Sequence, residues 1–289
     1  MSAPGSPGTH PLRPPGITAA PSPAGTPAAG TPAWPSFRGT PQLVGVSTSQ
    51  VSVYVDASLG AQASQNASDL VAAADGVVAR NNAIFAIQGG AANVIIFALN
   101  GRTDGTGGAD HAACNFTTGN NIEVDASYGS SQRVTALFEA ELSECAMGGN
   151  LCGLSTGESL SRWCGAVVSN NALTDFATAP QWAQDGMANW VDQADQTDQN
   201  ADSTGCGMAF ISWLLSQDHT LITIAQNMAG LGDSGTFAAL YAKLTGDQAS
   251  NAWQQFQSAI HGLTGGITSD DPFGAFAAAS AAVASAAGG

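Results

Sequence analysis

Two glutamates, Glu141 and Glu144, have the clearest potential for chemistry because they interrupt an apolar helical pattern. In residues 133–147 the apolar side chains recur at the spacing of one helix face, and Glu141 falls in the middle of that face. The apolar positions are Val134, Leu137, Phe138, Leu142 and Cys145. No Lys or Arg shares the face, and a carboxylate turned toward a core is costly unless it is protonated, paired or bound to a cation. The spacing therefore predicts an acidic site, or the remnant of one.

The same helix resembles a known catalytic motif. Residues 140–144 read Ala-Glu-Leu-Ser-Glu, which looks like the H-E-x-x-H helix of zinc metallopeptidases with both histidines replaced. Residues 182–188 read Trp-Ala-Gln-Asp-Gly-Met-Ala, which looks like the W-x-x-E-G-x-A helix of gluzincins. Over residues 51–263 the chain thus resembles gluzincin metallopeptidases, nearest to the basic-secretory-protein-like peptidases.

This resemblance implies roles for particular residues. Glu141 would be the general base, and Glu144 and Asp185 would stand at metal-ligand positions. Ala140 replaces the first histidine and cannot coordinate a metal, so His111 is the one histidine placed to substitute for it. Carboxylate ligands bind zinc poorly and suit calcium, magnesium or manganese. Zinc is therefore disfavoured, and calcium or another divalent cation is the alternative.

The N-terminal half has the patterns of an α+β fold with a small mixed sheet. Alternation over residues 51–55 and an apolar run over residues 94–99 predict two strands. Between them, residues 61–80 predict a helix that ends at Asn81 and Asn82. Strand, helix and strand in this order predict a right-handed parallel crossover.

A hairpin is expected next. Residues 111–116 and 121–125 read as two strands joined by a turn at residues 117–120. The resemblance implies that an edge strand of this kind lines a cleft and holds an extended peptide by backbone pairing. Residues 101–110 are rich in glycine, but no Lys-Ser/Thr pair follows, so they predict a flexible loop rather than a phosphate site.

After residue 147 the pattern is helical. Helices are expected at residues 157–169, 181–194, 204–216, 221–228, 236–244 and 248–260. Glu158 and Arg162 are spaced to pair on the surface, with the alternative that Arg162 orients a carboxylate of the site. Asp185 lies off the apolar face of its helix, so only the resemblance places it near Glu144.

Composition divides the chain into three parts. Residues 1–42 hold most of the prolines and predict a disordered tail. Trp34 and Phe37 could dock as a short anchor, although chance placement is favoured over docking. Residues 43–265 are expected to form one domain, which the resemblance implies is zincin-like, with a sheet-rich half to residue 130 and a helical half from residue 131. Residues 266–289 are rich in Ala, Ser and Gly and predict a second tail.

Charge excludes several classes of partner. Seven Lys and Arg against 22 Asp and Glu give a formal net charge of −15. A nucleic-acid groove or attraction to anionic lipid is therefore not expected, and no membrane span is expected. We expect a monomer that takes a peptide or protein in its cleft.

The five cysteines suggest an oxidising compartment, with one or two disulfides and one thiol left over. Their pairing cannot be read from the sequence, and an intracellular protein with buried thiols is the alternative. The N-terminus lacks the pattern of a signal peptide, so secretion or cell-surface location rests on cysteine use alone. Cys145 could be a nucleophile, but its place on the apolar face favours a packed thiol or half-cystine.

Three functions are compatible with these patterns. The first is a degenerate metallopeptidase-like protein that acts by binding in the former cleft. The second is an active metal-dependent hydrolase with Glu141 as base. The third is an acidic module that binds calcium through the aspartates of residues 192–202, whose spacing does not match an EF-hand and is also typical of a solvated loop.

Overall fold

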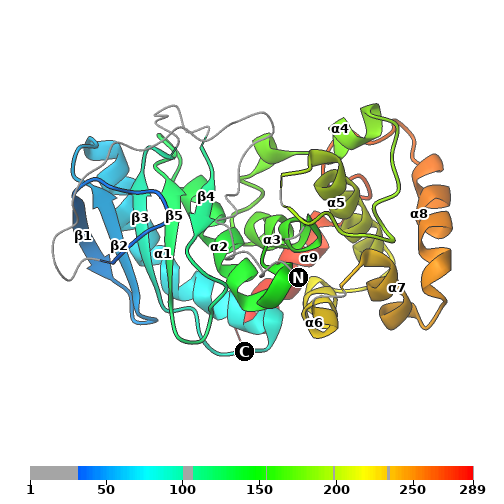
Figure 1. Cartoon of the computed structure of the whole chain (residues 1–289), viewed down its shortest axis with the longest axis horizontal. Helices are drawn as coiled ribbons and strands as arrows, with labels where there is room; N and C mark the ends of the chain where they lie inside the picture. The colour runs from blue at the N-terminus through cyan, green and yellow to red at the C-terminus, as the bar shows by residue number, and fades with distance from the viewer. Residues whose placement is uncertain (1–31, 100–106, 154, 198, 233–234, 289) are drawn as a thin grey trace, which may run out of the picture.

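The computed structural model of the chain describes residues 32–99, 107–153, 155–197, 199–232 and 235–288. Within them a mixed sheet lies at one end of the molecule and helices α4 to α8 lie at the other, with α2 and α3 between (Figure 1). The α+β class with a mixed sheet and a helical second half is thereby confirmed. The predicted disordered tail of residues 1–31 and the glycine-rich loop, apart from its last four residues, lie outside the described residues.

The sheet has five strands in the order β1-β2-β3-β5-β4. Their bounds are Pro41–Val46 (β1), Val51–Asp56 (β2), Ala92–Phe97 (β3), Ala109–His111 (β4) and Asn120–Asp125 (β5). The inner pairs β2–β3 and β3–β5 are parallel, whereas β1 and β4 pair antiparallel at the two edges. The strand predicted at residues 111–116 is wrong apart from His111, because β4 begins at Ala109 and ends at His111, which therefore stands where the edge strand turns into a loop.

Helix α1 (Ala61–Phe85) makes the predicted crossover between β2 and β3. The predicted end at Asn81 is wrong, because the helix continues through it. Asn81 is fully buried, and its side-chain amide donates to Glu139 of α2 at 3.2 Å. This tertiary contact overrides the tendency of asparagine to end a helix.

Helix α2 (Ser131–Met147) agrees with the predicted central helix. The Ser130 hydroxyl caps it by accepting from the Arg133 amide at 3.2 Å. It packs against α1, against β5 and against α3 (Ser155–Val168), so almost every side chain from residue 133 to 147 is buried. A helix covered on all sides turns its polar residues inward as well as its apolar ones.

The helical half is built around an aromatic core. Its remaining helices are α4 (Ala179–Gln184), α5 (Ala201–Ser216), α6 (Leu221–Leu231), α7 (Phe237–Thr245), α8 (Ala252–His261) and α9 (Phe276–Ala287). Phe210 of α5 contacts the rings of Trp213, Phe237 and Phe256 at centroid distances of 5.0–5.3 Å. The prediction of an internal helix at residues 204–216 is confirmed.

Helix α4 differs from its prediction. It ends at Gln184 rather than near residue 194, because Gly186 and Met187 take positive φ values of 99° and 54°. Glycine reaches this left-handed region readily and commonly stops a helix there. The motif of residues 182–188 therefore does not lie on a continuous helix.

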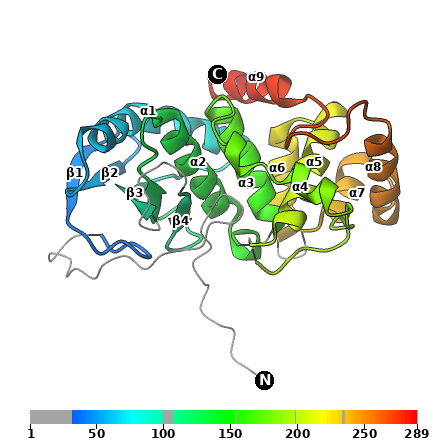
Figure 2. The same ribbon diagram turned by 90° about the horizontal axis from the view of Figure 1, so that it is seen from above.

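Both predicted tails extend too far into the fold. Helix α9 lies alongside α1 and α3 (Figure 2) and buries Ala279 and Val283 against them, so residues 276–287 are part of the folded domain. At the other end, Trp34 and Phe37 are each 5% exposed and pack with Phe97 and neighbouring side chains of β3. None of the described helices is both long and apolar enough to cross a membrane.

Candidate functional site

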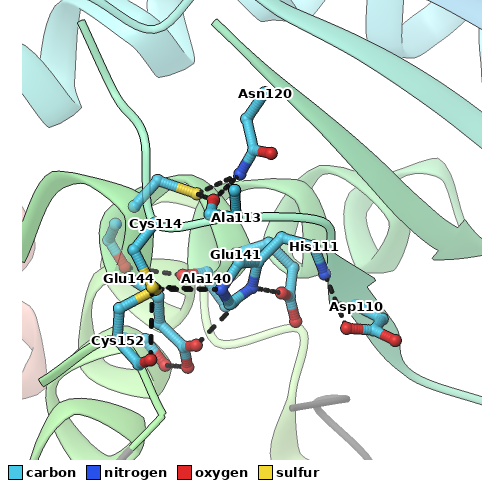
Figure 3. Close-up of polar contacts among 12 residues, drawn as sticks. Asp110, His111, Ala113, Cys114, Asn120, Ala140, Glu141, Glu144 and Cys152 are labelled. Atoms are coloured by element: carbon cyan, nitrogen blue, oxygen red, sulfur yellow. Dashed lines mark hydrogen bonds and ion pairs between the residues drawn. A yellow bond between two sulfur atoms is a disulfide. The ribbon is translucent and has the colours of Figure 1, made fainter. Parts of the chain in front are cut away.

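His111, Glu141 and Glu144 meet where β4 ends against α2 (Figure 3). His111 Nδ1 lies 2.6 Å from Glu141 Oε2 and 3.7 Å from Glu144 Oε2. The three residues are 4%, 0% and 1% exposed, respectively. The inward placement of Glu141 predicted from helical periodicity is therefore confirmed, and His111 lies beside it.

Three elements position this group. Glu141 and Glu144 are one helical turn apart on α2 and so share a face. Helix α3 holds Glu144 from the other side, because the Ser161 hydroxyl donates to Glu144 Oε1 at 3.0 Å. Strand β4 brings His111, which pairs with Ile122 of β5 in the antiparallel register.

The second ring nitrogen of His111 faces a disulfide. Cys114 and Cys152 are bonded, and Cys152 Sγ lies 2.9 Å from His111 Nε2. The imidazole thus lies between the Glu141 carboxylate and the disulfide (Figure 3). One disulfide is within the predicted number, but three cysteines, not one, are left over: Cys145, Cys164 and Cys206, all buried.

Asp110 adds a further carboxyl group beside the histidine. Its Oδ1 accepts from the His111 backbone N–H at 2.8 Å. Burial, together with the charges of Glu141 and Glu123, raises the pKa of Asp110 to about 8. Sequence reasoning missed Asp110 because it assigned this residue to the end of the glycine-rich loop, whereas β4 begins at Ala109.

The structure does not bring Asp185 into the group. Asp185 is exposed at the end of α4, where its neighbour is Asp202. Burial raises the pKa of Asp202, and the charge of Asp185 is a second, smaller cause of the same shift. Glu144 is buried under α3 instead. Asp185 is therefore not in one ligand group with Glu144, where the resemblance alone had placed it.

The zinc site of the gluzincin pattern does not fit these residues. Ala140 offers no donor atom, and Asp185 is outside the group. Within the described part of the chain, two sets of three His, Cys, Asp or Glu side chains could hold an ion, and both contain His111. One set is His111, Glu141 and Glu144, and the other is His111, Cys114 and Cys152. The aspartates of residues 192–202 are in neither set, and Asp198 lies outside the described residues.

Two other predicted features change in the structure. Burial raises the pKa of Cys145 to about 12, which keeps it a thiol and argues against a nucleophile. Glu158 and Arg162 do pair, at 2.6 Å, but they are 1% and 5% exposed rather than on the surface. Arg162 also donates to the Phe176 carbonyl at 2.7 Å, so it holds the segment after α3 in place.

Glu139, two residues before Glu141, makes a testable contrast with the site. It is completely buried, and burial raises its pKa well above its usual value of 4.5. Because the folded pKa is raised, its contribution to stability is fully present below about pH 4.5 and is lost as the pH rises toward the folded pKa. Glu139→Gln should therefore flatten the fall in unfolding free energy between pH 5 and 7, by up to about 1.4 kcal/mol per pH unit.

Urea unfolding of both proteins across this pH range would measure the difference. Equal slopes for the two proteins would contradict the raised pKa. The substitution keeps the oxygen that accepts from Asn81, so the contact between α1 and α2 is preserved while the ionisable group is removed.

Comparison with known proteins adds no further evidence. No family model, curated protein or solved structure matches the chain. The functional argument therefore rests on the geometry of the site.

Proposed function

We propose that this chain is a zincin-like protein that no longer hydrolyses peptides and binds a divalent cation through His111, Glu141 and Glu144. The observation that carries this proposal is the convergence of one nitrogen and two carboxylate ligand atoms, all within 4.8 Å of one another in a buried place. The mixed sheet with an antiparallel edge strand beside a central helix supports the zincin-like part.

Charge supports the cation. Two carboxylates share one imidazole in this group, so its formal charge is negative even when the histidine is protonated. Burying net charge is costly unless a counter-ion offsets it. The imidazole nitrogen among the ligands favours zinc, whereas the two carboxylates suit manganese, so these two ions are the candidates.

The number of side chains in the group argues against hydrolysis. A peptidase site of this type needs three protein ligands and a separate base that deprotonates the bound water. The group contains three side chains, and the neighbouring Asp110 carboxyl already accepts from the His111 backbone N–H. If Glu141 is a ligand no base remains among the three, and if Glu141 is the base only two ligands remain.

Peptide binding in the former cleft has less support. The Ala112 N–H donates to Asn121 of β5, so by strand alternation the His111 N–H points to the open edge. A peptide that added a strand would use this N–H, but it donates to Asp110 at 2.8 Å. A side chain that caps its own strand edge opposes strand addition. We therefore assign the binding role to the cation.

Calorimetric titration of the oxidised, full-length chain with zinc and with manganese tests the proposal. We expect a single equivalent of at least one of the two ions to bind. Glu144→Gln keeps the acceptor for Ser161 but removes a charged ligand atom. It should weaken binding by more than the roughly 10- to 100-fold that loss of an outer partner costs. Glu139→Gln is the matched control, because Glu139 is equally buried on the same helix but bonds to Asn81 instead, and it should leave binding unchanged.

Two results would contradict the proposal. The cation site fails if neither ion binds, or if Glu144→Gln binds as tightly as the wild type. The loss of hydrolysis fails if the loaded protein cleaves a peptide library and Glu141→Gln abolishes that cleavage.

A further inference from the structure

We infer that reduction of the Cys114–Cys152 disulfide creates a second metal site, in which His111 Nε2 and the two cysteine thiolates bind zinc. The site would use the Nε2 atom of the imidazole, on the side of the ring away from Glu141. It shares His111 with the cation site proposed above but does not depend on that site, since its ligands are sulfur atoms.

The three ligand atoms are already together. Cys152 Sγ lies 2.9 Å and Cys114 Sγ 3.9 Å from His111 Nε2, and all three atoms are within 4.8 Å of one another. Zinc–sulfur bonds of about 2.3 Å and zinc–nitrogen bonds of about 2.0 Å place tetrahedral ligands roughly 3.5 to 3.8 Å apart. Small rotations of the cysteine side chains therefore suffice once the sulfurs are no longer bonded to each other.

The redox state decides whether these sulfurs can be ligands. A thiolate binds metal, whereas a disulfide sulfur carries no negative charge to donate. Two cysteines and one histidine form a known zinc ligand set that leaves a fourth position for water. In the oxidised chain zinc can therefore bind His111 only at Nδ1, beside the carboxylates of Glu141 and Glu144.

Glu141 has a different task in each state. A neutral imidazole has one protonated and one unprotonated nitrogen. If a metal is on Nε2, the proton is on Nδ1, which lies 2.6 Å from Glu141 Oε2. A carboxylate that accepts from the far nitrogen orients the ring and strengthens it as a ligand. His111 can therefore serve only one of the two metal sites at a time, and the redox state of the Cys114–Cys152 pair determines which one.

A dithiol can carry out the reduction. Cys114 is partly exposed, whereas Cys152 is 5% exposed, so the attacking thiolate reaches the Cys114 sulfur first. A mixed disulfide forms with Cys114, and Cys152 leaves as a thiolate beside His111. The second thiol of the reductant then displaces Cys114, and the reductant departs as its own disulfide. Two electrons have passed to the protein, and zinc binding releases the two thiol protons.

Cobalt is a suitable probe because cobalt–thiolate bonds absorb light by charge transfer. The full-length chain is reduced with a phosphine, which takes an oxygen from water to become its oxide as the disulfide becomes two thiols. Excess reductant is removed without oxygen, and cobalt is added. We expect a thiolate charge-transfer band that saturates at a single equivalent and disappears on adding zinc, whereas the oxidised chain gives no such band.

Two variants identify the ligands. Cys114→Ser with Cys152→Ser should lose the band, although it keeps the other three thiols. Glu141→Gln leaves both cysteines and His111 in place, so it should keep the band but weaken cobalt affinity about 10- to 100-fold. That second readout keeps the test decisive if the double serine variant folds poorly.

The outcomes separate this inference from the proposed function. Absence of the band in reduced wild type, or its persistence in the double serine variant, would overturn the inference. Such a result would leave the cation site standing if the oxidised chain still binds an ion that Glu144→Gln loses. A band in the reduced chain, together with an oxidised chain that binds neither zinc nor manganese, would support the inference and overturn the proposed function.

Discussion

Replacing His111 by alanine is expected to lower the free energy of unfolding by about 3 to 5 kcal/mol at neutral pH, in buffer that contains a chelator. The imidazole lies 2.6 Å from Glu141 in a place where both side chains are at most 4% exposed. Its removal leaves the buried Glu141 carboxylate without this partner, and the loss of one member of a buried pair costs more than the pair contributes. Urea unfolding of both proteins measures the difference.

Two further variants make this result specific. His261→Ala removes an exposed histidine at the end of α8 and should change stability by no more than about 0.5 kcal/mol. His111→Ala combined with Glu141→Gln removes the charge as well as its partner, so it should be more stable than His111→Ala alone. If the double variant were the less stable of the two, the electrostatic explanation would be wrong.

Gly157→Ala is expected to cost about 3 kcal/mol or more, at the upper end of the range for overpacking. A Cβ atom at Gly157, in the first turn of α3, would stand 1.6 Å from the Leu151 carbonyl oxygen and 2.7 Å from its carbon. Both are backbone atoms and cannot rotate away. The segment that carries Cys152 would have to move away from the start of α3. Ser161 lies on this same helix.

Gly76→Ala is the matched control for this substitution. Gly76 lies inside α1, and its nearest neighbour for an added Cβ is Arg80 Nη1 at 3.8 Å. Alanine should therefore stabilise the protein there by up to about 1 kcal/mol, because it favours the helix more than glycine does. Thermal unfolding of the two variants should shift in opposite directions, and a stable Gly157→Ala protein would refute the close approach of α3 to Leu151.

The spacing of apolar residues predicted a helix correctly where the burial of its side chains determines the structure. It predicted α2 and the inward direction of Glu141, and it predicted α5 as an internal helix. It was wrong at Asn81 because a buried contact with Glu139 outweighs local preference. It was wrong after Gln184 because the left-handed backbone at Gly186 stops the helix.

The site was only partly predictable for the same reasons. Two glutamates one turn apart on an apolar face are visible in a sequence, and His111 was the one histidine on a strand expected beside them. Asp185 was assigned by resemblance alone, and the structure leaves it exposed at the end of α4, outside the group. The pairing of Cys114 with Cys152 spans 38 residues and comes from the packing of the loop after β4 against the segment before α3, so no local pattern signals it.

The central claim is that His111 joins Glu141 and Glu144 around a cation, and anomalous X-ray diffraction tests it most directly. Crystals of the oxidised, full-length protein would be soaked in zinc, and data would be collected on both sides of the zinc absorption edge. We predict an anomalous peak about 2.0 to 2.2 Å from His111 Nδ1 and from carboxylate oxygens of Glu141 and Glu144. Absence of a peak there both in this crystal and in one soaked in manganese and measured across the manganese edge, or a main peak beside Asp185, would contradict the account.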